Sequence, residues 1–480
     1  MNIAVICRVL GLALEVEGAF MTPALIIGLV RGEWAGVSGL SASMALILLA
    51  GVLLRRVPAR RSEFYAREGF VTVGLTWIIL SAFGGLPFYI SGDIPSFVDC
   101  FFETVSGFTT TGASIIPAVE ELPKCLLYWR SFTNWLGGMG VLVFVLAISS
   151  FTENSGDTLH ILRAESPGVK VGKLVPRMRK SSTILYAIYF GLTAAQVILL
   201  AFDMPFFDAL CTAFATGGTG GFSVRNAGIA AYSPYAQRVI TLFMLLFSVN
   251  FSVYYLLLLR RFRAAVHNEE LKVFVIIYTV CTLIIAADIT KVMGSFGTAL
   301  HHSAFTVSSI ISTTGFAISD FDAWPWLSKT MLVFIMFIGA CAGSTGGGMK
   351  VIRAVLAFKV IRRGVNRTIH PQEVRMIHMD GEVVEDETAD SVSAFLLVYI
   401  LLFVGAVLLL ALDGLDFTTT FSAVAACLNN IGPALGKAGP MLNYNCFSQP
   451  GKVLLAFAML FGRLEIYPML LLFVPSAWKK

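Results

Sequence analysis

Phe108-Thr109-Thr110-Thr111-Gly112-Ala113 is the first of four short glycine-bearing elements that recur along the chain. Each element lies between two long apolar segments. The other three are Gly218-Thr219-Gly220-Gly221-Phe222-Ser223, Ser312-Thr313-Thr314-Gly315-Phe316-Ala317 and Asn429-Asn430-Ile431-Gly432-Pro433-Ala434. Four non-helical elements of this kind at membrane depth, one per repeat, predict a pore built with fourfold pseudo-symmetry.

The composition excludes a set of ordinary soluble domains. Of the 480 residues, 56% are apolar and 14% are charged, whereas soluble domains carry about 25% charged residues. Many windows hold about 20 apolar residues, enough to cross a hydrocarbon core of about 30 Å. We therefore predict an all-α polytopic membrane protein. The eight cysteines are scattered and form no CxxC pair, so neither a disulfide framework nor a zinc site is expected.

Basic residues cluster between the repeats, at 55–67, 163–180, 260–272 and 353–375, and Lys479-Lys480 end the chain. Loops rich in Lys and Arg stay in the cytoplasm, so these connections and the C-terminus are expected inside and the glycine elements outside. Acidic residues flank the elements: Asp93, Asp99, Glu103, Glu120, Glu121, Asp203, Asp208, Asp320, Asp322, Asp413 and Asp416. A negative outer vestibule would concentrate cations. Alternatively, these charges only keep the outer loops polar.

We expect an N-terminal helix pair at 1–60 and four repeats of helix, pore loop and helix, at 66–150, 181–263, 271–358 and 388–480. In each repeat a segment of about 13 residues precedes the glycine element, and as a helix it would be about 20 Å long. Such a segment is too short to cross and suits a re-entrant half-helix. The polar linkers 151–180 and 364–387 are expected to be cytosolic connections.

The glycine elements have the composition of an ion filter. Non-helical backbone is tolerated in a membrane only where it lines water or is buried in protein. Glycine permits left-handed backbone angles, so successive carbonyls can point the same way. A ring of such carbonyls can replace the water shell of an alkali cation, and the neighbouring threonines can add hydroxyl oxygens. Alternatively, the glycines are packing contacts between helices.

Several stretches of the chain carry a family resemblance. They are Trp129-Arg130-Ser131, Trp135-Leu136-Gly137-Gly138-Met139-Gly140, Ala215 to Ser223, Gly343-Ser344-Thr345-Gly346-Gly347-Gly348-Met349-Lys350 and Asn430-Ile431-Gly432-Pro433. Over essentially its whole length the chain resembles the Trk/Ktr/HKT superfamily of potassium transporters, and within it the TrkH-type subunits. The extra N-terminal helix pair is a feature of Trk-like chains that the shorter Ktr-like chains lack.

The resemblance implies a potassium filter, in which each repeat gives one glycine and the carbonyls just before it coordinate the ion. Carried over to this chain, the ring is Thr110, Thr111 and Gly112; Thr219, Gly220 and Gly221; Thr313, Thr314 and Gly315; and Asn430, Ile431 and Gly432. The fourth copy lacks threonine and is followed by Pro433, so the ring should be asymmetric. The element is also shorter than the TVGYG of potassium channels, which implies less strict selectivity.

The resemblance further implies K⁺ as the transported ion and a homodimer in the inner (plasma) membrane of a bacterium. It implies a cytosolic ring of TrkA-like nucleotide-binding subunits docked on the basic inner face. The lipid bilayer is the other expected partner, and no nucleic acid is expected. No nucleotide-binding domain is visible in this chain, so nucleotide sensitivity would come from the partner.

The inner helix of the third repeat is expected to break and form a gate. Its glycines cost about 1 kcal/mol each against alanine in a helix, so the stretch should open into a loop below the filter; the candidate gate residues are Gly343, Gly346, Gly347, Gly348 and Lys350. The family places a flexible obstructing loop here. A plain kink or packing site is the alternative. A phosphate-binding loop is disfavoured because Val351 stands where Ser or Thr belongs and no strand precedes it.

Arg463 lies about midway in the apolar segment Leu454–Phe473. A mid-membrane arginine costs about 2.5–3.5 kcal/mol on insertion scales and normally faces an interior or water. We predict that Arg463 points into the cavity below the filter and repels cations, as the arginine of the family's fourth inner helix implies. The alternative is a pair with Glu465, although residues at i and i+2 do not face each other on a helix.

Arg130 has two open interpretations, an anchor of the filter surround or a marker of the membrane interface. His301 and His302 have no further ligand spacing nearby, so we expect structural roles for them. The sequence shows no nucleophile–base pair, so we predict that the protein is not an enzyme. Repeats of one order and orientation favour a pore over an inverted-repeat transporter. A sodium- or proton-coupled cation symporter on the same scaffold remains the alternative to plain potassium uptake.

Overall fold

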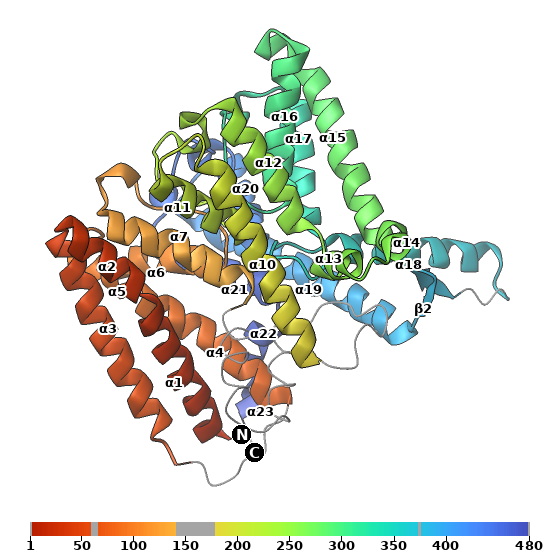
Figure 1. The fold of residues 1–480 in the computed structure, drawn as a ribbon. Coiled ribbons are helices and arrows are strands. Elements are labelled where there is room, and N and C mark those ends of the chain that lie inside the picture. The colour runs from red at the N-terminus through yellow and green to blue at the C-terminus, as the bar shows by residue number, and fades with distance from the viewer. Residues whose placement is uncertain (1, 59–65, 141–177, 373–375, 479–480) are drawn as a thin grey trace.

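The computed structural model describes residues 2–58, 66–140, 178–372 and 376–478 (Figure 1). The described chain is mostly helical, as predicted, and its only strands form one small two-stranded sheet. Most of the predicted linker 151–180, the end of the first repeat and several of its basic residues lie outside the described residues.

The N-terminal pair consists of α1 (Ile3–Phe20), α2 (Thr22–Arg31) and α3 (Trp34–Arg55). The first expected helix is therefore divided at Met21, two residues before Pro23 in the first turn of α2. Helices α1 and α3 lie side by side (Figure 1). A Cβ on Gly11 would press on the carbonyl of Gly51, and a Cβ on Gly51 would press on the carbonyl of Gly11. These two glycines act as close-packing contacts between helices.

The segments predicted as the first two repeats combine longer helices with several shorter ones of 6 to 12 residues. Their described helices are α4 (Ala66–Gly84), α5 (Leu86–Ser91), α6 (Phe97–Phe108), α7 (Lys124–Gly138), α10 (Met178–Leu200), α11 (Phe206–Gly217), α12 (Pro234–Ser248), α13 (Phe251–Leu258) and α14 (Phe262–His267). Helices α12 and α13 meet at 90°. The sequence analysis did not predict this bend.

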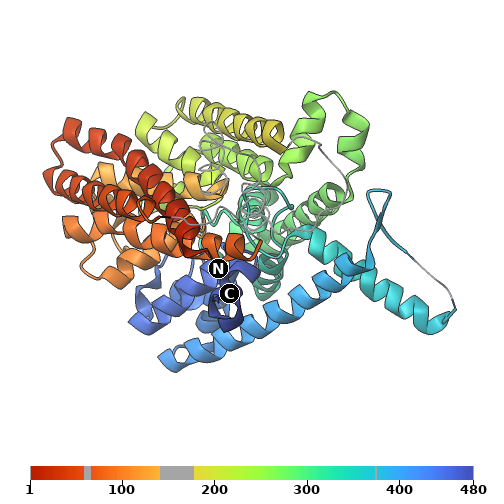
Figure 2. The same ribbon diagram turned by 90° about the horizontal axis from the view of Figure 1, so that it is seen from below.

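The last two repeats contain α15 (Glu269–Met293), α16 (Phe296–Ile311), α17 (Trp326–Ile338), α18 (Val351–Ile369), α19 (Asp386–Leu410), α20 (Phe417–Leu428), α21 (Gln449–Arg463), α22 (Tyr467–Phe473) and α23 (Pro475–Trp478). Strands β1 (Ile377–Met379) and β2 (Glu382–Val384) pair antiparallel between α18 and α19. The outer part of α18 and this hairpin project from the rest of the molecule (Figures 1 and 2). Single 3₁₀ turns form at Val119–Glu121, Gly228–Ala231, Phe321–Ala323, Ala411–Asp413, Gly436–Ala438 and Tyr444–Cys446.

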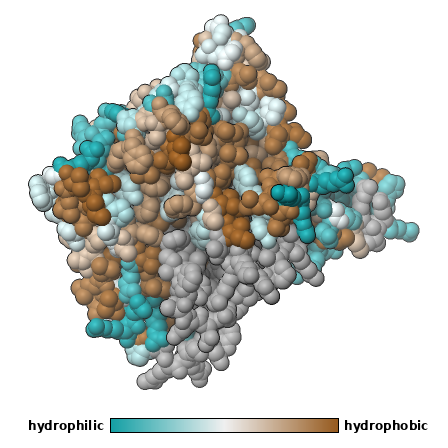
Figure 3. Space-filling view, in the orientation of Figure 1, coloured by the Kyte–Doolittle hydropathy of each residue, from teal (hydrophilic) through white to brown (hydrophobic). Residues whose placement is uncertain are grey.

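Four described helical segments are long and apolar enough to span a membrane, namely Trp34–Arg55, Arg67–Ser91, Glu269–Met293 and Asp386–Asp413; the bent pair α12 and α13 makes a fifth if it is one span. Apolar side chains are exposed on α3 and α15, where Figure 3 shows brown surface. Helices α6, α11 and α20 have 12 residues each and α16 has 16. At about 1.5 Å per residue, all four are too short to cross a bilayer.

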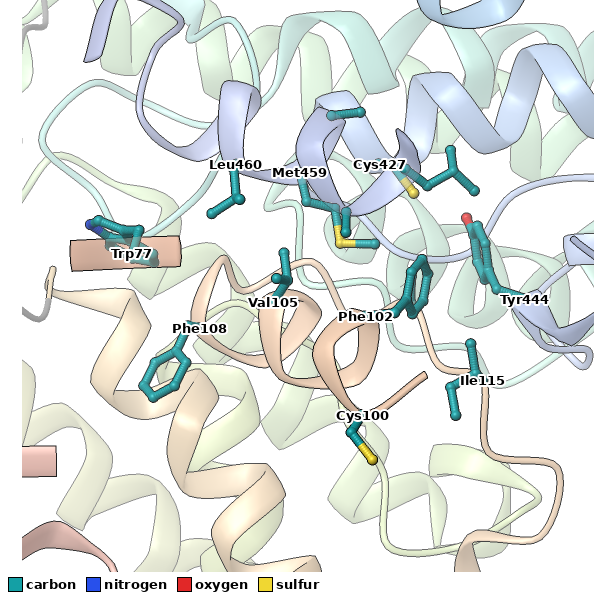
Figure 4. Close-up of a cluster of buried hydrophobic side chains, with 14 of the residues drawn as sticks. Trp77, Cys100, Phe102, Val105, Phe108, Ile115, Cys427, Tyr444, Met459 and Leu460 are labelled. Carbon is teal, nitrogen blue, oxygen red and sulfur yellow. The ribbon is translucent and has the colours of Figure 1, made fainter. Parts of the chain in front are cut away.

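The largest buried apolar cluster joins the first repeat to the fourth. In it α6 packs against α21, and Phe102 and Val105 face Met459 (Figure 4), while Phe108 packs edge to face on Trp129 of α7. Tyr444, from the outer turn after α20, belongs to the same cluster. The short helix α6 is thereby fixed among protein elements, which positions the glycine element at its C-terminal end.

Candidate functional site

The four glycine elements share one backbone conformation. In each, the residue two positions before the glycine is left-handed although it has a side chain, with φ of 54° at Thr110, 56° at Thr219, 58° at Thr313 and 54° at Asn430. The glycines are also left-handed, with φ of 79° at Gly112, 67° at Gly221, 81° at Gly315 and 96° at Gly432. The sequence predicted this freedom for the glycines and missed it for the three threonines and the asparagine.

The first left-handed residue of each element closes the helix before it. The next amide donates back to the carbonyl five residues earlier, from Thr111 to Ser106 (2.8 Å), Gly220 to Ala215 (2.8 Å), Thr314 to Ser309 (2.9 Å) and Ile431 to Ala426 (2.9 Å). This is the helix end that usually carries glycine. A residue with a Cβ costs about 1–2 kcal/mol in this conformation, so the surroundings must hold it there.

The glycines bring the four elements into contact in cyclic order. A Cβ on Gly112 would overlap the carbonyl oxygen of Gly220, one on Gly221 that of Thr314, one on Gly315 that of Ile431, and one on Gly432 that of Thr111. Each glycine thus faces the carbonyl that precedes the glycine of a neighbouring element, and the fourth element returns to the first. Only glycine fits such an approach of backbone to backbone.

A cavity of ≈ 230 Å³ opens on one side of this ring, and all four glycines line it. None of its lining residues is Asp or Glu, whereas Arg130 and Arg225 are among them. The acidic residues that flank the elements therefore do not line this cavity. Several of the flanking acids form ion pairs instead: Asp99 with Lys452 (2.8 Å), Glu103 with Arg130 (2.7 Å), Asp208 with Arg225 (3.3 Å) and Asp322 with Lys329 (3.7 Å).

Arg130 anchors the surround of the ring. It is 3% exposed, its Nε donates to Glu103 on α6 and its Nη1 donates to the carbonyl of Ser223 at 2.9 Å. Its guanidinium carbon lies 3.6 Å from the centre of the Phe222 ring. Glu103 also accepts from the amide of Ile115 at 2.9 Å. Arg130 thus ties the first element to the second, which favours the anchor over the interface marker.

A non-helical loop lies against the ring on the other side. Helix α17 ends at Gly339, whose φ is 74°, and α18 begins after Lys350, whose φ is 75°. The amide of Gly347 donates to Oγ1 of Thr313 at 2.6 Å, and a Cβ on Gly347 would press on Asn430. The inner helix of the third repeat is broken where the run of glycines predicted, and its loop touches the third and fourth elements.

Both ends of this loop are held by neighbouring helices. One oxygen of Glu270, in the first turn of α15, accepts from the amides of Ala342 (2.7 Å) and Ile352 (3.1 Å). On the other side, the amide of Cys341 donates to Ser248 (3.1 Å) and that of Phe251 to Gly343 (2.9 Å). The bend between α12 and α13 supplies these contacts. Glu270 was not among the residues predicted from the sequence, because an acid in the first turn resembles an ordinary helix-dipole residue.

Arg463 joins the loop to the first repeat. Its Nη1 donates to the carbonyl of Thr345 at 2.8 Å, and its Nη2 donates to the carbonyls of Gly138, at 2.9 Å, and Gly137. Glu465 forms an ion pair with Arg353 of α18, and Nζ of Lys350 donates to the carbonyl of Gly346.

The fourth inner helix is broken, which the sequence analysis did not predict. Helix α21 ends at Arg463, Glu465 and Ile466 are left-handed with φ of 52° and 72°, and α22 starts at Tyr467 with Pro468 in its first turn. Arg463 therefore lies at a helix C-terminus and not in mid-helix. A cation is favoured there because the last carbonyls carry partial negative charge.

The two histidines of α16 lie apart from the ring. Nε2 of His301 bonds to Oε1 of Gln237 at 2.7 Å, and the His301 and His302 rings meet edge to face. Their contacts are those of structural residues.

A model of the TrkH family, described as a cation transport protein, matches residues 38–480. The chain belongs to this family. It is 36% identical to the Trk system potassium uptake protein TrkH of Vibrio parahaemolyticus serotype O3:K6 over 99% of both chains, and 33% identical to that of Escherichia coli strain K12 over all of both. The crystal structure of the potassium transporter TrkH from Vibrio parahaemolyticus superimposes with a TM-score of 0.87, at 33% identity, and covers 100% of both chains.

Family membership confirms the resemblance stated from the sequence motifs and the fold class of a helical polytopic membrane protein. The family is one of cation transport proteins, so the prediction that this chain is not an enzyme is confirmed too.

Proposed function

We propose that the chain takes up potassium across the inner membrane of a bacterium through a filter made by the four glycine elements. The observation that carries the proposal is the closed cyclic order in which Gly112, Gly221, Gly315 and Gly432 each meet a neighbour's carbonyl. Such an order brings backbone oxygens of four repeats around one axis. A ring of carbonyls can replace the hydration shell of an alkali cation at little cost.

Some polar side-chain atoms of the ring form hydrogen bonds within the protein, and others form none. Nδ2 of Asn430 donates to Oγ1 of Thr111 (3.0 Å) and to the carbonyl of Met459 (2.9 Å), so this amide braces the fourth element. Among the described residues, Oγ1 of Thr110 and Oδ1 of Asn430 are buried without a hydrogen-bond partner. Buried oxygens are normally satisfied. Oδ1 of Asn430 lies beside Gly347 and Gly462, so of these two oxygens we assign only that of Thr110 to the ion. The backbone of Thr219, Gly220, Thr313, Thr314 and Ile431 supplies the remaining oxygens.

We assign the gate to the loop and the arginine that holds it. The loop residues Gly343, Gly346, Gly347, Gly348 and Lys350 lie between the ring and α18, and Arg463 fastens Thr345 to α7. In this arrangement the loop obstructs the inner side of the ring. The positive charge of Arg463 adds an electrostatic barrier in a site shielded from water. Opening requires that Arg463 release the carbonyls and that the loop move aside.

The cytosolic side is assigned from the basic residues. Arg362, Arg363 and Arg367 lie on α18, which projects from the molecule beside the β1–β2 hairpin (Figure 2). By the preference of Lys and Arg for the cytoplasmic side, this projection and the C-terminus face inward. We propose that a cytosolic TrkA-like nucleotide-binding ring docks there and that the chain works as a homodimer.

The experiment is flux through the purified full-length chain in liposomes, with potassium, sodium and proton gradients imposed one at a time. Potassium entry that follows the potassium gradient alone supports uptake through a pore. Entry that requires an inward sodium or proton gradient would instead establish the coupled symporter. Absence of potassium flux under every gradient, from protein that is folded by size-exclusion chromatography, contradicts the proposal.

A further inference from the structure

The fourth glycine of the ring carries a contact that the other three lack. The hydroxyl of Tyr444 donates to the carbonyl oxygen of Gly432 at 2.5 Å. Among the hydrogen bonds of the described residues, no side chain donates to the carbonyl of Gly112, Gly221 or Gly315. The fourth element also departs from the others in sequence, since Asn430 replaces threonine and Pro433 follows the glycine.

Tyr444 is fixed in place from several sides. It is 2% exposed, and its backbone amide donates to the carbonyl of Ser114, in the outer segment of the first repeat, at 2.8 Å. Its ring lies beside that of Phe102 on α6 (Figure 4), with 5.7 Å between the ring centres, and its ring centre is also 5.7 Å from that of Phe447. Because the aromatic ring of Tyr444 packs on both Phe102 and Phe447, its hydroxyl cannot move away from Gly432 without opening the apolar cluster. Tyr444 also lines the cavity outside the ring.

A phenol in this position restrains the backbone of the fourth element at Gly432. A backbone carbonyl has two acceptor positions, and Tyr444 takes one of them and fixes the direction of the C=O bond. Selectivity in a ring of carbonyls depends on the number, field strength and freedom of the dipoles. Fixing Gly432 also limits the movement of the adjoining Ile431 carbonyl, which faces Gly315 in the ring. In a mobile element that carbonyl could turn inward and close on an ion smaller than K⁺.

We propose that Tyr444 is a specificity-determining residue of this ring. Its hydroxyl holds the Gly432 carbonyl so that the fourth element cannot collapse onto Na⁺, and it compensates for the departures at Asn430 and Pro433. The inference rests on the proposed function, because it assigns a role in ion selection to one member of the filter.

The test compares the ratio of potassium to sodium flux in liposomes for the unmodified chain, Tyr444→Phe and Tyr235→Phe. The Phe variant keeps the ring that packs on Phe102 and removes only the hydroxyl. Tyr235 is the matched control, since its hydroxyl also donates to a backbone carbonyl, that of Leu199 at 3.2 Å, away from the ring. We expect Tyr444→Phe to lower the flux ratio about three- to tenfold, the range that one net hydrogen bond corresponds to. Tyr235→Phe should leave it unchanged.

An unchanged ratio in Tyr444→Phe, at normal potassium flux, overturns the role of Tyr444 and leaves the proposed function standing. An equal fall in both variants overturns it too. If Tyr444→Phe does not fold, 3-fluorotyrosine in place of Tyr444 keeps the hydroxyl as a stronger donor, and its ratio should equal or exceed that of the unmodified chain. A lower ratio overturns the inference. No potassium flux in the unmodified chain overturns the inference and the proposed function together.

Discussion

The amide of Gly347 donates to the hydroxyl of Thr313 at 2.6 Å, so the intramembrane loop is fastened directly to one of the four elements of the ring. Thr313 is itself left-handed, with φ of 58°. Thr313 therefore belongs to the ring through its backbone and contacts the loop through its side chain. This contact links ion selection to gating in the proposed function.

Thr313→Val should raise basal potassium flux. Valine keeps the shape of threonine but leaves the buried amide of Gly347 without an acceptor, at a cost of about 1–3 kcal/mol to the fastened loop. The measurement is potassium flux in liposomes without any cytosolic partner. Thr290→Val is the control, because the Thr290 hydroxyl only donates to Ala286 within α15. Equal flux in Thr313→Val and Thr290→Val would contradict the proposal that the hydrogen bond between Thr313 and Gly347 holds the loop in place.

Arg463→Ala should also raise potassium flux, because it removes a partly buried positive charge and the three hydrogen bonds that fasten Thr345 to Gly137 and Gly138. Arg463→Lys keeps the charge but loses the planar guanidinium that reaches several carbonyls. Its flux should therefore lie between that of the unmodified chain and that of Arg463→Ala. Flux is measured at equal protein density in the liposomes. If alanine and arginine give the same rate, Arg463 is not part of the gate.

Glu270→Ala should loosen the loop at both ends while leaving the ring in place. The variant removes the shared acceptor of the Ala342 and Ile352 amides. Hydrogen exchange of peptides covering 340–352 should quicken by about tenfold, as expected when charge-assisted hydrogen bonds are lost. Glu269→Ala is the neighbouring control, because Glu269 bonds instead to Lys359 and to the Asp380 amide. If residues 340–352 stay protected from hydrogen exchange in Glu270→Ala, Glu270 does not hold the loop in place.

Gly315→Ala should abolish selective potassium flux. A Cβ there would overlap the Ile431 carbonyl, and φ of 81° strains any residue other than glycine. Gly405→Ala is the control, since Gly405 lies in α19 with no neighbouring atom within 4 Å of an added Cβ. Helix propensity predicts that Gly405→Ala is tolerated. Flux ratios are compared at equal expression, and normal selectivity in Gly315→Ala would exclude the ring as the filter.

The short helices and the loop were visible in the sequence because single residues mark them. Ser96 caps α6 at the amide of Asp99, and the helix fills the short segment expected before the first glycine element, while α17 ends at Gly339, where the glycine-rich stretch begins. These are local signals of composition and capping, which do not depend on distant partners. For the same reason the glycine positions of the ring could be identified before the fold was known.

The structural features that could not be predicted from the sequence depend on contacts between distant segments of the chain. The left-handed state of Thr110 is imposed by its surroundings against its own preference. The break after Arg463 also escaped prediction, because hydropathy continues through Leu464 to Phe473. The ion pairs of the flanking acids could not be predicted either, because sequence shows charge but not pairing: Glu103 faces Arg130 across 27 positions of sequence, and Asp99 faces Lys452 across 353.

Cation density in the ring tests the central claim most directly. We predict that crystals of the full-length chain soaked in thallium show anomalous density on the axis between the carbonyls of Thr111, Gly220, Thr314 and Ile431, and that excess potassium displaces it. Gly315→Ala crystals should lack that peak. Thallium sites found only away from these four carbonyls, with the axis filled by side chains or lipid, would contradict the account.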